Sequence, residues 1–293
     1  MQVNTGQYPP ISIVILTIGQ RPVELKKSVI SVKNQIKCTP EIILVWNGTE
    51  PTGDIEVNKN IVLEENIGIP SGRNVGASHA KSDVIMFLDD DAEIIQEDLL
   101  MKAITHFKSK PKLGVLGCRL VDQNGETSRR HIPRIGSKSA SISGYTAGFL
   151  GGACLIRKSA WNSSGGYADE LFYGMEETDL SWRIIDRGWQ IYYDANLSIY
   201  HPKFYPSRHS DSLRLTARNR VWIAKRNLPL PLRIIYIWNW IVITFSRNIN
   251  SLISVQLILR GLIEGFRSSP LEKQLMRWKT VSTLIKLRRP PII

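Results

Sequence analysis

Short apolar runs alternate with helix-like segments over the first two hundred residues of the chain. Helices are expected from Pro22 onward, where apolar residues recur every three or four positions, and over Glu97–Phe107 and Thr178–Arg187. The runs with the length and composition of buried strands are Ile11–Thr17, Glu41–Trp46, Val84–Leu88, Gly114–Gly117, Ala153–Arg157 and Gln190–Tyr193. This alternation predicts an α/β fold whose sheet is built from βαβ units.

The pattern changes in the last third of the chain, where the helical segments become basic and aromatic. Ser212–Arg226 predicts a basic helix, and Ile249–Phe266 has the apolar spacing of an amphipathic helix. Between them, Ile234–Phe245 is almost wholly apolar but shorter than the roughly 20 residues that a membrane-spanning helix needs. We therefore divide the chain into a first domain, residues 1–205, and a helical C-terminal region, residues 206–293.

The net charge of +12 belongs entirely to that C-terminal region. Residues 201–293 contain 17 Lys and Arg against 3 Asp and Glu, whereas residues 1–200 contain 21 against 23. Such asymmetry indicates contact with anionic lipid, nucleic acid or phosphate. The aromatic residues Tyr236, Trp238 and Trp240, flanked by arginines, favour a membrane interface, and the alternative is a pair of helices packed on the core.

Cysteine usage and the first residues of the chain indicate a reducing compartment. The three cysteines, Cys38, Cys118 and Cys154, are scattered and include no CxxC pair, so neither a disulfide framework nor a thiolate zinc site is expected. Met1–Pro10 is polar and lacks the basic and apolar parts of a signal peptide. We expect a cytoplasmic protein.

Three consecutive carboxylates, Asp89, Asp90 and Asp91, follow directly on the apolar run Val84–Leu88. Ligands of open α/β sheets lie at the carboxyl ends of the strands, and oxygen ligands suit Mg²⁺ or Mn²⁺. The run therefore predicts a divalent-cation site. The alternative is a solvated acidic turn that caps the next helix.

Two further segments have compositions that are typical of ligand sites. Asn66–Gly68 and Gly72–Gly76 are glycine-rich, which permits close approach of the backbone to a ligand, and Arg73 can meet a phosphate or one of the carboxylates. Glu176–Asp179 places acidic residues where a helix begins, so one of them is either a general base or a partner of the helix dipole.

The order of these motifs resembles that of the family 2 glycosyltransferases over roughly residues 11–202. The segments that carry the resemblance are IVILTIGQRP, EIILVWNG, NIGIPSGRNVG, FLDDDAE, GGACLIRKSAW, GGYADELFYGMEETDLSWRIIDRGW and YHP. The chain is most similar to bacterial rhamnosyl- and galactofuranosyltransferase-like members. The resemblance implies the Rossmann-like GT-A fold, which has a mixed, mostly parallel central sheet with flanking helices, followed here by a C-terminal helical appendage.

The resemblance also implies roles for individual residues. Asp89 and Asp91 match the DxD motif, which contacts the donor and holds the metal ion, and His201 matches a histidine that completes the metal coordination. Glu177 stands where the family has its catalytic Asp, with Glu176 as a rival for the base. Residues expected at the nucleotide sugar are Thr17, Trp46, Asn47, Arg73, Asn74, Asp89, Asp90 and Gly152.

One position departs from the family pattern. The second strand of the family ends in an Asp that reads the uracil imide, and Trp46 followed by Asn47 stands there in this chain. Trp46 is expected to stack on a base and Asn47 to hydrogen-bond it. The identity of the base stays open, with UDP or dTDP favoured over GDP.

The function expected from the sequence is an inverting, metal-assisted transfer of a sugar from a nucleotide diphosphate sugar to a saccharide or lipid-linked acceptor. We expect Mg²⁺ or Mn²⁺ as cofactor, a role in cell-envelope polysaccharide synthesis, and attachment to the inner face of the cell membrane through the C-terminal region, without a nucleic-acid partner. The alternatives are a sugar-phosphate nucleotidyltransferase, for which Gly19–Pro22 matches a phosphate loop poorly, and a non-catalytic RNA- or lipid-binding protein.

Overall fold

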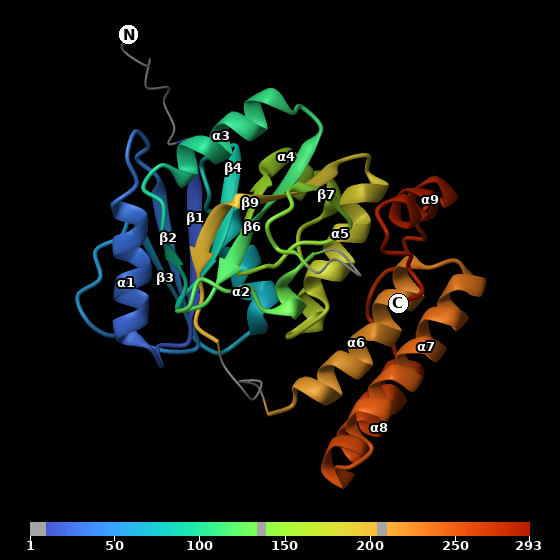
Figure 1. The fold of residues 1–293 in the computed structure, drawn as a ribbon. Helices are drawn as coiled ribbons and strands as arrows, with labels where there is room; N and C mark the ends of the chain where they lie inside the picture. Colours follow the sequence, from blue (N-terminus) through green and yellow to red (C-terminus); the bar gives the residue numbers. More distant parts are fainter. Residues whose placement is uncertain (1–9, 134–138, 204–209) are drawn as a thin grey trace.

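The computed structural model describes residues 10–133, 139–203 and 210–293, and there the strands form one nine-stranded sheet with helices on both faces (Figure 1). The strands are β1 (Ser12–Thr17), β2 (Glu41–Asn47), β3 (Lys59–Leu63), β4 (Val84–Asp89), β5 (Glu93–Ile94), β6 (Leu113–Val121), β7 (Gly144–Thr146), β8 (Ala153–Arg157) and β9 (Gln190–Tyr200). The helices are α1 (Pro22–Lys33), α2 (Gly68–Ser78), α3 (Leu99–Ser109), α4 (Lys158–Ser164), α5 (Glu176–Asp186), α6 (Ser212–Asn227), α7 (Leu230–Asn248), α8 (Leu252–Arg267) and α9 (Trp278–Lys286).

The sheet is mixed, as the sequence predicted. Its order is β3-β2-β1-β4-β8-β6-β9-β5, with β7 paired to β9. Of the eight strand pairings among the described residues, β1–β2, β1–β4, β2–β3 and β6–β9 are parallel and the other four are antiparallel. Because β1 and β4 are parallel neighbours with Leu16 opposite Asp89, the residues after both strands meet at one edge of the sheet.

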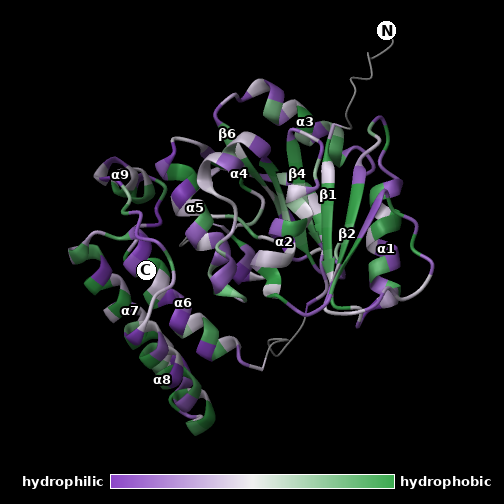
Figure 2. Cartoon of the chain, turned by 180° about the vertical axis from the view of Figure 1, so that it is seen from behind, coloured by the Kyte–Doolittle hydropathy of each residue, from purple (hydrophilic) through white to green (hydrophobic). Residues whose placement is uncertain are grey.

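The core fills both faces of the sheet. Residues of β1 and β2 that point to one side pack with α1 and α3, and their neighbours in sequence pack on the other side with α2, α4 and α5. Figure 2 shows the hydrophobic character of these central strands. Burial on both faces explains why the sequence runs of β1 and β2 are continuously apolar instead of alternating.

The glycine-rich segment after residue 66, expected to be a ligand loop, is instead largely the helix α2. A side chain at Gly72 would lie 2.5 Å from a methyl of Leu16, and one at Gly76 would lie 2.3 Å from a methyl of Val14. The glycines therefore allow α2 to approach β1 closely, and this helix–sheet contact explains their presence. The strand β3 and the helices α4 and α9 were also missed.

The stretch Asp122–Ser143 contains a short 3₁₀ helix at Arg129–His131. Residues 134–138 of this stretch lie outside the described residues. The short segment after it, β7, pairs with β9 and so attaches the stretch to the far part of the sheet.

The C-terminal region packs on the first domain through α6 and α9. One hydrophobic cluster joins Leu180 and Trp182 of α5 with Ile223 of α6, Tyr236 of α7 and Leu284 of α9. Packing on the core, one of the two alternatives considered for these helices, holds for α6, which belongs to a core that continues across residue 205. The helices α7 and α8 expose large apolar side chains. No helix of the described residues has the length and apolar content needed to cross a bilayer.

Candidate active site

The carboxyl ends of β1 and β4 place Thr17 beside the three aspartates. Thr17 Oγ1 donates a hydrogen bond of 2.7 Å to Asp90 Oδ2 and accepts one of 3.0 Å from the Gly19 amide. We call Asp89, Asp90 and Asp91, together with His201, the carboxylate edge. Thr17 therefore positions a carboxylate of this edge.

Arg21, which the sequence analysis assigned only to a poor phosphate loop, neutralises the carboxylate edge. Its guanidinium lies 3.0 Å from Asp90 Oδ1 and 2.5 Å from Asp91 Oδ2. Burial raises the pKa of Asp90 to about 6, although the charge of Arg21 and the hydroxyl of Thr17 oppose the rise. A basic residue just after β1 was the available signal, because β1 and β4 end side by side.

His201 completes a group that can hold a metal ion. Tyr200 at the end of β9 pairs with Glu93 of β5, which brings the next residue back beside the aspartates. His201 Nε2 lies 3.4 Å from Asp89 Oδ2 and 3.5 Å from Asp91 Oδ1, and one ligand atom from each of the three residues lies within 4.8 Å of the others.

The donor set and the orientation of the histidine fit a divalent cation. His201 Nδ1 lies 3.0 Å from the Pro202 carbonyl, which leaves Nε2 directed at Asp89 and Asp91. Although burial alone would lower the pKa of His201, the hydrogen bond to Asp89 and the charges of the two carboxylates raise it, and a metal ion would take the place of the proton on Nε2. Two carboxylates and one imidazole suit Mn²⁺ or Mg²⁺. The three residues that the sequence assigned to the metal are thus brought together.

His131 is a second histidine at this place that the sequence analysis did not single out. Its ring centroid lies 6.3 Å from that of His201, in an edge-to-face arrangement. Burial, the charge of Arg130 and the neighbouring His201 lower the pKa of His131 to about 4, which keeps this ring neutral at physiological pH.

Arg73 projects from α2 beneath the carboxylate edge. It is 5% exposed, and its Nη2 lies 2.7 Å from Asp89 Oδ1. Although burial alone would raise the pKa of Asp89, hydrogen bonding to His201 and the charge of Arg73 hold it below its usual range. Arg73 is thus paired with a carboxylate, one of the two partners that the sequence allowed.

The two glutamates at the start of α5 have different surroundings. Glu176 is 4% exposed, and burial together with the neighbouring Glu177 raises its pKa to about 8. Its Oε2 has no hydrogen-bond partner among the described residues. Glu177 is half-buried, lines a cavity, and accepts a hydrogen bond of 3.2 Å from the Gly151 amide. Glu177 is the glutamate that faces open space.

Gly151 and Gly152 join the base candidate to the carboxylate edge. A side chain at Gly152 would lie 2.0 Å from Asp89 Oδ2, and one at Gly151 would lie 2.4 Å from Arg73 Nη1 and 2.6 Å from Glu177 Oε1. The bare backbone of these two residues therefore passes between the two carboxylates. Gly152, expected at the nucleotide sugar, makes room for the Asp89 side chain.

Three residues expected to bind the donor serve the fold in this structure. The Trp46 side chain lies in the core beside α1 with 1% exposure and donates to Asn60 Oδ1, so its ring presents no face for stacking on a base. The Asn47 amide group bonds Asn66, the Ile67 amide and the Gly68 carbonyl. The Asn74 side chain bonds both backbone groups of Tyr167 and the carboxylate of Asp169. Trp46 thus joins β2 to β3, and Asn47 and Asn74 each hold a loop.

The loop before α5 is held by α6, which sequence reasoning did not foresee. Asn219 Nδ2 donates to the carbonyls of Leu171, Tyr173 and Gly174 at 2.8, 3.0 and 2.8 Å. Phe172 and Met175 in this loop have positive φ angles of 59° and 75°. Because such angles are strained for residues other than glycine, the contact with Asn219 maintains the approach to Glu177.

Asp179, the last acid of the motif, fastens α5 to α6 and is not a reactive group. It is fully buried and bonds Arg183, Arg226 and Asn227. The helix α5 and the C-terminal region are therefore joined by a buried ionic network.

Comparison with known proteins adds the family. A family model described as "Glycosyl transferase family 2" matches residues 12–163, more than half of the chain. The chain belongs to this family. This membership replaces the two alternatives considered from the sequence, a nucleotidyltransferase and a non-catalytic binding protein, with a glycosyltransferase.

Two curated relatives of this family 2 glycosyltransferase are distant. An uncharacterized protein of Haemophilus influenzae is 26% identical over 176 residues, which cover 55% of this chain and 95% of the relative. An N-acetylglucosaminyl-diphospho-decaprenol L-rhamnosyltransferase of Mycobacterium tuberculosis is 30% identical over 84 residues, which cover 27% of each chain. The chain thus spans about a quarter of that rhamnosyltransferase.

Solved structures share the fold. TarS of S. aureus (residues 1–349) matches with a TM-score of 0.62 and 14% identity, covering 89% of this chain and 81% of TarS. GalNAc-T7, solved with UDP, GalNAc and Mn²⁺, matches with a TM-score of 0.61 and 17% identity, covering 80% of this chain and 50% of its own. The mannosyltransferase PcManGT of Pyrobaculum calidifontis, solved with GDP-Man and Mn²⁺, matches with a TM-score of 0.56 and 14% identity, covering 96% of this chain and 80% of its own. The predicted GT-A fold is confirmed.

Proposed function

We propose that this family 2 glycosyltransferase transfers one sugar, with inversion at the anomeric carbon, from a nucleotide diphosphate sugar to a hydroxyl of a lipid-linked saccharide. The observation that carries the proposal is the arrangement around Gly151 and Gly152. Their backbone separates the half-buried Glu177 carboxylate from Asp89, and Asp89 belongs to the three-residue group that suits a metal ion. A base on one side and a diphosphate site on the other is the arrangement that in-line displacement requires.

The residues have separate roles in this reaction. Glu177 takes the proton of the acceptor hydroxyl as its oxygen attacks the anomeric carbon, and the bond from that carbon to the donor diphosphate breaks. Asp89, Asp91 and His201 would hold Mg²⁺ or Mn²⁺, which when bound neutralises the charge that develops on the leaving diphosphate. Arg73 keeps Asp89 in place. Glu176, whose pKa is raised to about 8, is protonated at neutral pH and leaves the role of base to Glu177.

The donor is tested by thermal stabilisation with UDP, dTDP and GDP, each with and without Mn²⁺. We expect a metal-dependent rise in Tm with UDP or dTDP, of about 5 °C at a hundredfold excess over Kd. A rise with GDP alone would overturn the expectation that the donor nucleotide is UDP or dTDP. The absence of any rise would overturn the donor site itself.

The stereochemistry is tested with water as the acceptor. The anomer of the free sugar first released from the donor, followed by ¹H NMR, is expected to be opposite in configuration to the donor. Release of the same anomer would replace inversion with retention.

The C-terminal region is proposed to lie on the anionic inner face of the cell membrane, which would make the enzyme cytoplasmic and peripheral. Arg247, Arg260 and Arg267 accompany an exposed apolar surface on α7 and α8, and each cation near an anionic leaflet contributes about 1 kcal/mol. The large apolar side chains of this surface are Leu230, Ile234, Ile235, Trp238, Val242, Leu252, Ile253, Leu259, Ile263 and Phe266.

Point variants test this proposal better than truncation, because α6, α7 and α9 share the core of the first domain. The double variant Trp238→Glu with Leu252→Glu, at positions 65% and 80% exposed, is expected to lose sedimentation with phosphatidylglycerol vesicles. Val23→Glu, at a position 62% exposed on α1, is the matched control and should sediment as the wild type does. Equal sedimentation of all three proteins would refute membrane attachment through this surface.

A further inference from the structure

A cavity of about 110 Å³ opens beside Glu177 on the side away from the carboxylate edge. One wall consists of the loop 147–149 and α5 of the first domain, and the other of α6, α7 and the segment after α9. The C-terminal region therefore builds half of the space into which the proposed base projects. Because the carboxylate edge is the proposed donor side, this cavity is where an acceptor reaches Glu177.

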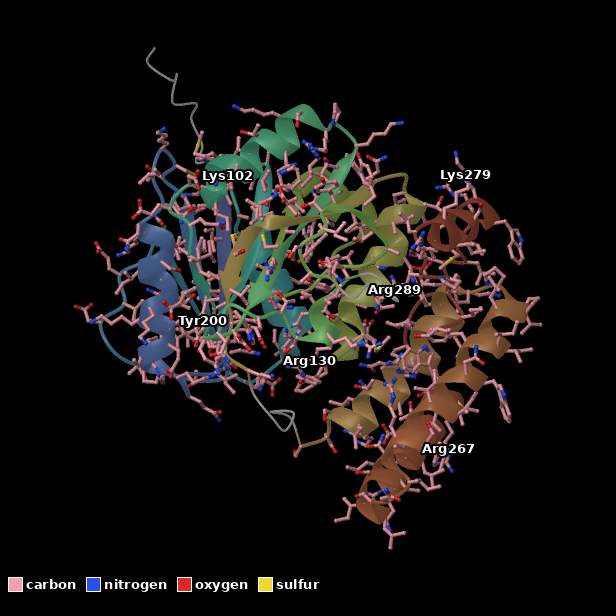
Figure 3. The ribbon with its side chains drawn as sticks, viewed as in Figure 1. Lys102, Arg130, Tyr200, Arg267, Lys279 and Arg289 are labelled. Carbon is pink, nitrogen blue, oxygen red and sulfur yellow. The ribbon has the colours of Figure 1, made fainter. Side chains whose placement is uncertain are left out.

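Two arginines from the C-terminal region converge on this cavity. The guanidinium of Arg220, on α6, lies 3.4 Å from the centroid of the Trp240 ring and donates to Tyr236 Oη at 3.3 Å. Arg289, after α9, extends its Nη1 to within 3.1 Å of the position that a side chain at Gly148 would occupy. Figure 3 places Arg289 between the sheet domain and the C-terminal helices, whereas Arg267 and Lys279 lie on their outer parts.

Neither guanidinium has a carboxylate partner. Within residues 10–133, 139–203 and 210–293, no Asp or Glu side-chain oxygen lies within 4 Å of Arg220 or Arg289. Burial and the like charge of Arg220 lower the pKa of Arg289, although Tyr236 opposes the shift. Glu177 is the acidic residue that lines the same cavity.

Buried donors without acceptors accompany the two arginines. Ser181 Oγ lines the cavity, Trp240 Nε1 lies on the indole that Arg220 covers, and neither has a hydrogen-bond partner among the described residues. Desolvated cations and unpaired donors are costly unless a ligand supplies the missing acceptors. The cavity thus has an excess of donors over acceptors on its C-terminal wall. We call Arg220 and Arg289 the arginine wall.

We propose that Arg220 and Arg289 bind the phosphate of the acceptor, so that the acceptor is a saccharide linked through phosphate or diphosphate to its lipid. This inference rests on the proposed function and names the group by which the enzyme recognises its second substrate. Paired guanidiniums match the oxygens of a phosphate, which accepts several charge-assisted hydrogen bonds. The phosphate is held on the C-terminal side, the sugar hydroxyl is presented to Glu177, and no bond at phosphorus changes.

The experiment uses n-decyl phosphate and neutral n-decyl glucoside as probes, below their micellar concentrations, in EDTA so that the carboxylate edge binds no metal-bridged phosphate. Calorimetric Kd values are compared for the wild type, Arg289→Gln, Arg220→Lys and the control Lys279→Gln on α9, at an exposed position outside the cavity. We expect decyl phosphate to bind at least tenfold more weakly to Arg289→Gln and Arg220→Lys, and as tightly to Lys279→Gln as to the wild type. Decyl glucoside should not distinguish the four proteins.

Several results would overturn the inference. Unchanged decyl phosphate binding in both cavity variants would show that the arginines have another role. Equal losses of phosphatidylglycerol vesicle binding in the cavity variants would assign the arginines to bilayer headgroups. The stabilisation by nucleotide and Mn²⁺ serves as the folding check for each variant. If it persists while decyl phosphate fails to bind the wild type, only this inference fails, whereas loss of nucleotide binding in the wild type would remove the proposed function itself.

Discussion

The carboxylate edge and the arginine wall lie on opposite sides of Glu177, and they differ in whether their arginines are paired with carboxylates. At the carboxylate edge, Arg21 pairs with Asp90 and Asp91, and Arg73 pairs with Asp89. At the arginine wall, Arg220 lies over the Trp240 ring, and within the part of the chain that the structure describes neither guanidinium has a carboxylate oxygen within 4 Å. The arginines of the edge are paired within the protein before a donor arrives, whereas those of the wall have charge left to be matched.

This difference separates residues that maintain a site from residues that await a ligand. A buried ion pair satisfied within the protein contributes to the folded state, and removing one partner is costly because the other charge stays buried. A desolvated cation without a partner gives the folded state no such pairing. Such a cation is better explained by a ligand than by stability. The predictions below test this distinction, beginning with the largest effect.

The largest expected effect is the loss of turnover when Glu177, which lies between the two regions, is replaced. Glu177→Gln is expected to lower turnover by about 10²–10⁴-fold, the usual contribution of a general base, while stabilisation by nucleotide and Mn²⁺ survives. Glu176→Gln is the matched control. Because Glu176 is already protonated at neutral pH, its amide variant should keep turnover within about tenfold of the wild type. A larger loss in Glu176→Gln than in Glu177→Gln would exchange their roles.

The second prediction compares the loss of stability on removing a paired arginine, Arg21, with that on removing an unpaired one, Arg289. Arg21→Gln is expected to destabilise the metal-free protein by about 3 kcal/mol, since Asp90 and Asp91 are left buried without their cation. Arg289→Gln should change the free energy of unfolding by less than about 1 kcal/mol or raise it, because no carboxylate loses a partner. Urea unfolding measures both. Equal destabilisation by the two variants would contradict the distinction between edge and wall.

The third prediction concerns the loop that carries strained residues toward Glu177. Asn219→Leu removes three hydrogen bonds to the carbonyls of Leu171, Tyr173 and Gly174, and we expect a loss of about 2 kcal/mol in stability with a lower kcat at nearly unchanged nucleotide binding. Asn248→Ala on α7, whose amide bonds only the Thr244 carbonyl, is the control and should leave kcat unchanged. A normal kcat in Asn219→Leu would show that the loop keeps its shape without this contact.

The last prediction concerns the protonation state of Glu176. Its pKa in the folded protein is raised from 4.5 to about 8, so its favourable contribution is complete below pH 4.5 and is lost as the pH rises through 8. Glu176→Gln should therefore gain stability relative to the wild type between pH 5 and 8, by at most about 1.4 kcal/mol per pH unit. Thermal unfolding at several pH values measures this. A difference that does not change with pH would mean that Glu176 titrates normally.

The sequence was informative wherever one residue type has one explanation. Apolar runs predicted most strands because burial on both faces tolerates little else, and the order of the motifs placed Asp89, Asp91 and His201 together. The cluster depends on the pairing of β5 with β9, a contact between residues more than a hundred positions apart. Only the family resemblance conveyed that contact.

The sequence was misleading where a residue type serves two purposes. The glycines of α2 permit helix packing as readily as ligand contact, and Trp46 and Asn47 are as suitable for a core and a loop as for a nucleotide base. Arg21 and Asn219 were missed because their value depends on partners that lie far away in the chain. The type of a residue shows which bonds its side chain can form, whereas the fold determines which partners are within reach.

The hydrogen bonds from Asn219 to the loop before α5 have a consequence for the order in which the parts of the protein form during synthesis. The loop belongs to residues 171–174, but the side chain that holds its carbonyls is made about 45 residues later, in α6. Domains fold as the ribosome releases them from the N-terminus onward, so the sheet and the carboxylate edge form first. A nascent chain that already has every residue of the proposed donor site still lacks Asn219, which holds the loop that leads to the proposed base Glu177. If Glu177 is the base, as proposed, catalysis begins only when the C-terminal region has been made.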